Sequence, residues 1–133
     1  MQTEPPGNPA SVLVVEDDQE ISRLLKRNLE NENTRVVEVA TGLDCIKTIQ
    51  EARVDLVLLD LRLPDFNGWG ILSLLRFTES LHHIPVIVVS VEPPNTDLIE
   101  QLKPNDYVQK PFDIRDLVRR VRRVMDSSKP TES

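Results

Sequence analysis

The stretch DLVLLDLRLPDFNGWGIL, residues 55–72, is the part of this sequence that says most about its fold. It begins within a mostly apolar run, residues 54–59, that shows little polar alternation. A strand of this kind is buried on both faces, which is typical of a parallel sheet covered by helices. Asp60 follows the run directly, and the apolar residues Trp69, Leu72 and 75–77 then predict a helix.

Four further apolar runs predict four more strands, at residues 12–15, 36–39, 86–89 and 107–108. Segments with apolar residues at helical spacing separate them. Five strands alternating with helices predict a doubly wound α/β domain with a parallel sheet and helices on both faces. The strand order of the flavodoxin-like version of this fold is 2-1-3-4-5.

The helices are expected to begin at polar caps. Asp18 is a plausible N-cap of the first helix, Thr41 and Asp44 resemble a capping box at the second, and Asp113 precedes the last. The fourth helix is expected to be short, because prolines delay its start and Pro104 ends it. Only about residues 96–102 remain for it.

Composition limits the classes of protein that fit. The chain of 133 residues is 39% hydrophobic and carries a net charge of −6, which suits one folded domain and argues against direct nucleic-acid binding. The single cysteine, Cys45, is typical of a reducing, cytoplasmic setting, and no apolar run is long enough to span a membrane. We expect a flexible segment at residues 1–10, a domain at 11–125, and a flexible tail or linker at 126–133.

Polar residues follow four of the predicted strands: Glu16 and Asp17, then Asp60, Ser90 and Lys110. The carboxyl ends of the first and third strands are neighbours in the predicted order, so these side chains should converge. Clustered carboxylates repel one another unless a proton or a cation joins them, and hard oxygen ligands suit Mg²⁺. The pattern favours phosphoryl transfer, with Asp60 as nucleophile and with Ser90 and Lys110 as phosphate-binding groups.

With these residues, the chain resembles the receiver domain of two-component response regulators. The matching segments are VLVVEDD (12–18), DLVLLDLRLPDFNGWGIL (55–72), IPVIVVS (84–90) and DYVQKPF (106–112). Pro64 lies four residues after Asp60 and Gly68 eight residues after it. The resemblance is specific because four features occur in this order, each at a strand end. They are an acidic pair, this Asp, a Ser and a Lys-Pro.

The resemblance implies a metal site and a phosphoacceptor. Asp17, Asp60 and the backbone carbonyl of Arg62 would bind Mg²⁺ directly, and Glu16 would bind it through water. Asp60 would accept the phosphoryl group of a sensor histidine kinase or a phosphotransfer protein. The domain would then be a signalling switch rather than an enzyme, with an output partner or output domain that the sequence does not identify.

The resemblance also implies how the switch works. Ser90 and Lys110 would bind the phosphoryl group, and Tyr107 would be the aromatic residue whose rotamer follows Ser90. The bond between Lys110 and Pro111 would be cis. A homodimer is possible, although the shortened stretch between Ser90 and Lys110 is expected to remodel the face of fourth helix, fifth strand and fifth helix that the family uses.

Departures from the family pattern lie around the phosphoacceptor. Val91 stands where Ala or Gly is usual and could narrow the entrance to Asp60. Arg62 and Glu92 occupy variable flanking positions and could form an ion pair that shields the acyl phosphate from water. The chain between Ser90 and Lys110 is about two residues shorter than usual and lacks the common Gly-Ala.

Other functions remain as alternatives. The altered fourth helix favours a receiver-like interaction module that works without phosphate, and the complete acidic, Ser and Lys set disfavours it. The arginines of the last helix, Arg115, Arg119, Arg120, Arg122 and Arg123, would form a solvated face or a docking face for a partner. No P-loop or dinucleotide-binding glycine motif is present.

Overall fold

The computed structural model describes residues 9–127. The strands are β1 (Ala10–Val15), β2 (Thr34–Val39), β3 (Leu56–Leu59), β4 (Val86–Ser90) and β5 (Asp106–Gln109). The helices are α1 (Gln19–Leu29), α2 (Gly42–Glu51), α3 (Gly68–Arg76), α4 (Thr96–Leu102) and α5 (Ile114–Ser127). Every predicted strand and helix is therefore present, and α4 is the two-turn helix that its flanking prolines predict.

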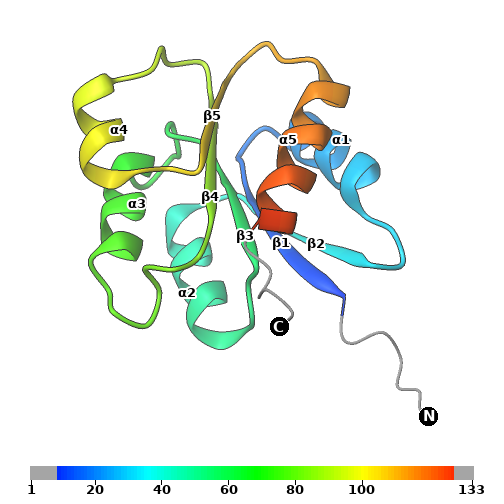
Figure 1. The fold of residues 1–133 in the computed structure, drawn as a ribbon, viewed down its shortest axis with the longest axis horizontal. Helices are drawn as coiled ribbons and strands as arrows, with labels where there is room; N and C mark the ends of the chain where they lie inside the picture. Colours follow the sequence, from blue (N-terminus) through cyan, green and yellow to red (C-terminus); the bar gives the residue numbers. More distant parts are fainter. Residues whose placement is uncertain (1–8, 128–133) are drawn as a thin grey trace.

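The five strands form one parallel sheet in the order β2-β1-β3-β4-β5, which confirms the predicted fold class and strand order. Helices α1 and α5 cover one face of the sheet, and α2, α3 and α4 cover the other (Figure 1). The carboxyl ends of β1 and β3 are neighbours, with helices leaving them toward opposite faces. This is the switch point of a flavodoxin-like sheet.

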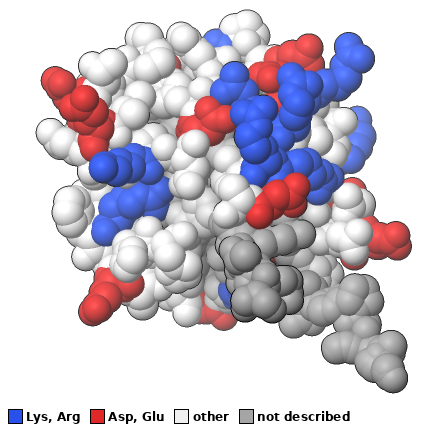
Figure 2. Space-filling view, viewed as in Figure 1, with Lys and Arg blue, Asp and Glu red and all other residues white. Residues whose placement is uncertain are grey.

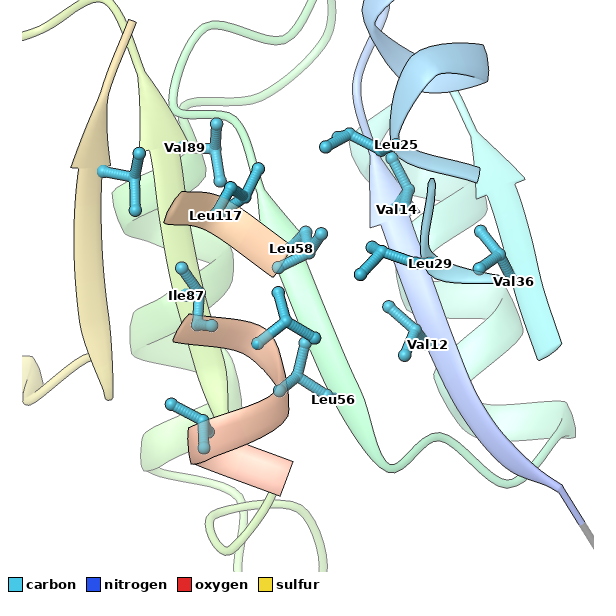
Figure 3. Close-up of a cluster of buried hydrophobic side chains, with 13 residues drawn as sticks. Val12, Val14, Leu25, Leu29, Val36, Leu56, Leu58, Ile87, Val89 and Leu117 are labelled. Atoms are coloured by element: carbon cyan, nitrogen blue, oxygen red, sulfur yellow. The ribbon is translucent and has the colours of Figure 1, made fainter. Parts of the chain in front are cut away.

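Alternating residues of the central strands contribute their side chains to two hydrophobic cores, one on each face of the sheet. Val12 and Val14 point to the core under α1 and α5, and Leu13 and Val15 point to the core under α2, α3 and α4. Figure 3 shows the first core, in which Leu117 packs among side chains of the sheet. Because both faces of β1, β3 and β4 are covered, these strands need apolar residues at nearly every position.

Each predicted N-cap residue accepts an N–H group at the start of its helix. The Asp18 carboxylate accepts the backbone N–H groups of Glu20 and Ile21, and the Thr41 hydroxyl accepts that of Asp44. The Asp113 carboxylate accepts the N–H of Arg115 at the start of α5. These short polar side chains satisfy N–H groups at the helix start that no helical carbonyl can reach.

The ordered elements extend slightly beyond the expected domain. β1 begins at Ala10 and α5 continues to Ser127. The flexibility expected at both ends concerns mostly residues 1–8 and 128–133, which lie outside the described residues. Among the described helices, none is long and apolar enough to cross a membrane.

Arg76, the last residue of α3, joins three segments of the chain. Its guanidinium donates to the carbonyls of Leu102, Ile84, His82 and Lys103, and to the side-chain carbonyl of Asn105, at 2.9–3.2 Å. Lys103 caps α4 in the left-handed conformation, with φ of 51°, where a glycine would be unstrained. The arginine thus donates hydrogen bonds to the carbonyls of Leu102 and Lys103, which have no helical partners at the end of the short α4.

We expect Arg76→Ala to lower the free energy of unfolding by about 2 kcal/mol, because several carbonyls would lose a charged donor at once. Arg76→Lys should recover only part of this loss, since an ammonium cannot match a planar guanidinium with five donors. Urea unfolding followed by circular dichroism measures both, with the exposed Arg27→Ala as control. A loss for Arg76→Ala no larger than for Arg27→Ala would contradict this account.

The outer surface of α5 carries a concentration of basic side chains, seen over α5 in Figure 2. Arg120 pairs with Asp106 of β5 at 2.9 Å and with Asp116 at 3.0 Å, and Arg119 pairs with Asp116 at 2.8 Å. Arg122 donates to the Thr34 hydroxyl and to the Leu29 carbonyl. Part of this basic face therefore holds α5 against the rest of the domain.

Candidate functional site

The predicted convergence of side chains at the carboxyl edge of the sheet is present. The Lys110 Nζ lies 2.7 Å from Glu16 Oε1 and 3.1 Å from Asp60 Oδ2. Glu16 directly follows β1, Asp60 directly follows β3 and Lys110 directly follows β5, so three strands supply one cluster. Glu16 and Asp60 are only 3% and 5% exposed, which makes this a buried ionic site rather than a surface ion pair.

Asp17 completes a group of three carboxylates. Oxygen atoms of Glu16, Asp17 and Asp60 all lie within 4.8 Å of one another, and Asp17 is the exposed member. A cluster with one solvent-facing ligand leaves room for water around a bound cation. Hard carboxylate oxygens with space for water are the donor set that Mg²⁺ prefers.

Burial and charge shift the titration of the cluster. Desolvation, together with the nearby Asp60, outweighs the hydrogen bond from Lys110 and raises the pKa of Glu16 to about 7. Burial alone would lower the pKa of Lys110, but its hydrogen bonds and charge interactions with Glu16 and Asp60 raise it instead. The single positive charge of Lys110 thus balances only part of the negative charge of three carboxylates. The cluster therefore favours binding of a proton or a cation.

Backbone contacts hold Asp60 and Lys110 in place. The Asp60 N–H donates to the Val15 carbonyl at 3.0 Å, and Asp60 Oδ1 accepts the N–H of Arg62 at 3.1 Å. The Lys110 N–H donates to the Ser90 carbonyl at 2.8 Å, and the following peptide bond to Pro111 is cis, as the family resemblance implies.

Ser90 is fully buried at the end of β4. Its hydroxyl accepts the backbone N–H of Glu92 at 3.3 Å, which closes a tight turn after the strand. The Gln109 side chain donates to the Val91 carbonyl at 3.1 Å from β5. The structure therefore places Ser90 at the same sheet edge as Asp60 and Lys110 and fixes the loop that follows it.

The three residues expected to control access lie at the surface of this edge. Arg62 Nε and Glu92 Oε2 are 3.2 Å apart and form the ion pair that the sequence suggested. Their side chains are 67% and 29% exposed, so the pair is screened by water and weak on its own. Val91 is 45% exposed beside them.

Tyr107 is half-buried on β5, and its hydroxyl reaches the loop after Ser90 rather than Ser90 itself. It donates to the Glu92 carbonyl at 2.6 Å and approaches the Pro93 carbonyl at 3.3 Å. Burial, then the charges of Glu92 and Asp60, raises the pKa of Tyr107. Its ring stacks on Trp69 of α3, with centroids 6.2 Å apart and an interplanar angle of 29°.

Two contacts that support the site were not predicted from the sequence. The Asp65 carboxylate accepts the N–H groups of Gly42 and Leu43 at 2.8 and 3.0 Å, which ties the loop after Asp60 to the start of α2. The contact between Trp69 and Tyr107 joins α3 to β5. Both join residues more than 20 positions apart in the sequence, and no local sequence pattern predicts either of them.

Comparisons with known proteins agree with this geometry. The model of the response regulator receiver domain family matches residues 12–122. The transcriptional regulatory protein PcoR of Escherichia coli is 35% identical over 116 residues, which cover 86% of this chain and 50% of that protein. This chain spans about half the length of the curated relatives that it matches.

Solved structures match over nearly the whole chain. A CheY-like receiver domain from Methanospirillum hungatei superposes with a TM-score of 0.83 at 25% identity, covering 91% of this chain and 97% of that one. The receiver domain of the Francisella response regulator 1452 gives a TM-score of 0.79 at 30% identity, covering 92% of this chain and 100% of that one.

Proposed function

Since this chain belongs to the family of response regulator receiver domains, we propose that Asp60 accepts a phosphoryl group from a partner histidine kinase or a phosphotransfer protein. Membership of the family makes the domain a signalling module rather than a catalytic enzyme. One observation supports the assignment of Asp60 above all others. Its buried carboxylate shares the Lys110 ammonium with Glu16 at the switch point of the sheet.

In the proposed reaction, an Asp60 carboxylate oxygen attacks the phosphorus atom and an acyl phosphate forms. The bond between phosphorus and the donor's imidazole nitrogen breaks. Lys110 pairs with one phosphoryl oxygen, and the Ser90 hydroxyl donates to another. Burial of Asp60 keeps bulk water away from the acyl phosphate, while Arg62, Val91 and Glu92 limit access at the mouth.

The carboxylate cluster fits a divalent cation. Glu16, Asp17 and Asp60 offer oxygen atoms within 4.8 Å of one another, and the cluster carries more negative charge than Lys110 can balance. We propose that these residues and the Arg62 carbonyl hold Mg²⁺, with Glu16 acting through water. When bound, the cation would neutralise charge on both the cluster and the incoming phosphoryl group.

The proposed consequence is a change in the surface formed by α4, β5 and α5, which an output partner or output domain reads. Tyr107 connects this surface to the loop after Ser90. A receiver-like module that works without phosphate is the alternative, and the short α4 is the observation that favours it. The basic face of α5 is a candidate surface for the output partner.

Incubation with Mg²⁺ and a small phosphodonor such as acetyl phosphate tests the proposal. We expect the mass of one phosphoryl group to appear on the intact protein, to survive acid and to disappear in mild base, because acyl phosphates are base-labile. Peptide mapping should locate it at Asp60, and chelation of the metal should suppress it. A protein that stays unmodified, or is modified at another residue, would refute the assignment.

A further inference from the structure

Glu92, the second residue after β4, contacts three parts of the candidate site at once. Its carboxylate accepts from Arg62 Nε at 3.2 Å, across the mouth of the site. Its backbone N–H donates to the Ser90 hydroxyl oxygen at 3.3 Å, and its carbonyl accepts from the Tyr107 hydroxyl at 2.6 Å. The entrance, the proposed phosphate-binding hydroxyl and the proposed switch residue Tyr107 therefore meet at one residue.

The contact with Ser90 determines what that hydroxyl can do. A serine hydroxyl has one proton to donate and oxygen lone pairs that accept. Because the Ser90 oxygen already accepts from the Glu92 N–H, its own proton remains available for an acceptor such as a phosphoryl oxygen. The position of the Glu92 backbone thus prepares Ser90 for phosphate.

The contact with Tyr107 links the same backbone to α3 and β5. The hydroxyl is anchored on the Glu92 carbonyl, and the ring lies against Trp69. A shift of the Glu92 carbonyl would remove the anchor of the hydroxyl and allow the ring to leave Trp69. Trp69 is the only tryptophan of the chain and Tyr107 the only tyrosine, so fluorescence can report on this stack.

Arg62 supplies the contact that holds the Glu92 side chain, and it comes from the loop that follows Asp60. We propose that the Arg62–Glu92 ion pair positions the backbone of Glu92, and thereby sets both the readiness of Ser90 for phosphate and the placement of Tyr107 on Trp69. This inference rests on the proposed phosphoacceptor function. It makes Arg62 and Glu92 positioning residues in addition to their place at the mouth of the site.

The first test needs no phosphate. Acrylamide quenching of Trp69 fluorescence is measured in the metal-free protein, in Arg62→Gln and in Glu92→Gln, with the exposed Glu100→Gln and Arg27→Gln as matched controls. We expect both variants of the pair to show stronger quenching than the unaltered protein, because the Tyr107 ring covers Trp69 less, and both controls to match it. Quenching that is unaltered in Arg62→Gln and Glu92→Gln would overturn the proposal.

The second test uses the phosphoryl mimic beryllofluoride with Mg²⁺. Glu92→Gln and Tyr107→Phe should each weaken its binding about two- to fivefold, the range that a screened ion pair or one hydrogen bond can supply. The double variant should bind beryllofluoride no more weakly than the single variant with the lower affinity, because both changes release the same backbone. Fully additive losses would overturn the coupling.

The two tests separate this inference from the proposed function. If the protein without substitutions neither bound beryllofluoride nor became phosphorylated, the phosphoacceptor function would be refuted. The quenching comparison would still test the role of the ion pair. A protein that is phosphorylated normally but shows no quenching difference between the pair variants and their controls would refute the inference alone.

Discussion

Asp60→Asn is expected to abolish phosphorylation and, at the same time, to raise the free energy of unfolding by about 1–2 kcal/mol in the absence of metal. The amide cannot act as the nucleophile, so no acyl phosphate forms. The amide also removes one of three clustered negative charges. Lys110 is not left unpaired by the change, because it keeps Glu16 at 2.7 Å.

The stability gain separates an active-site carboxylate from a structural one. A structural ion pair loses stability when one buried partner is removed, because the other charge is left buried alone. Here the cluster carries excess negative charge, and the charge of Asp60 is among the causes that raise the pKa of Glu16. Asp60→Asn should therefore relieve repulsion.

Urea unfolding with a chelator present, together with the phosphodonor assay, measures both effects. Asp97→Asn, a change of an exposed carboxylate on α4, is the control that should keep phosphorylation and change stability by less than about 0.5 kcal/mol. A destabilised Asp60→Asn would show that the cluster is held together mainly by its ion pairs. Continued phosphorylation of Asp60→Asn would place the phosphoacceptor elsewhere.

Gly68→Ala is expected to lower the free energy of unfolding by about 3 kcal/mol, at the upper end of the usual cost of overpacking. A Cβ at Gly68 would lie 2.5 Å from the Asp60 carbonyl oxygen and 2.7 Å from the Leu61 Cα. Both are backbone atoms and cannot rotate away as a side chain would. The first turn of α3 would have to move off the end of β3, and the backbone of Asp60 would move with it.

Gly70→Ala, two residues further along α3, is the matched control for this prediction. A Cβ there meets nothing within 4 Å, and the position is exposed. Alanine should stabilise the helix by about 0.5–1 kcal/mol, because it forms helix more readily than glycine. Thermal or urea unfolding of both variants would check the contrast, and equal effects of the two substitutions would contradict it.

The pattern of apolar residues was enough to predict the order of strands and helices. Buried strands such as β3 need apolar side chains on both faces, and helices such as α1 need them every third or fourth position, so both leave local periodic signals. The exact ends of the strands were predicted less well from the same pattern. β2 begins at Thr34, earlier than its apolar run, because parallel pairing with Ala10 of β1 does not depend on the side chain.

The core of the candidate site was equally predictable, because its residues occupy strand ends. Once the strand order is 2-1-3-4-5, the carboxyl ends of β1 and β3 must be neighbours, and Glu16 must approach Asp60. Lys110 also lies at this edge because it directly follows β5, but β5 is two strands from β3, and the long lysine side chain reaches Asp60.

The sequence by itself therefore determined what local patterns record: the strands and helices, their succession along the chain, and the polar residues that follow the strands. The order of strands in the sheet, and with it the acidic cluster, followed from the fold type that this succession predicts. Only the tertiary structure decided which side chains reach backbone atoms of distant segments. Arg76 binds carbonyls of the α3–β4 loop and at the end of α4, Asp65 binds N–H groups of α2, and Tyr107 binds the carbonyl of Glu92. Every residue carries such backbone groups, so the choice of partner depends on distance in the folded chain and leaves no signature in the residue types.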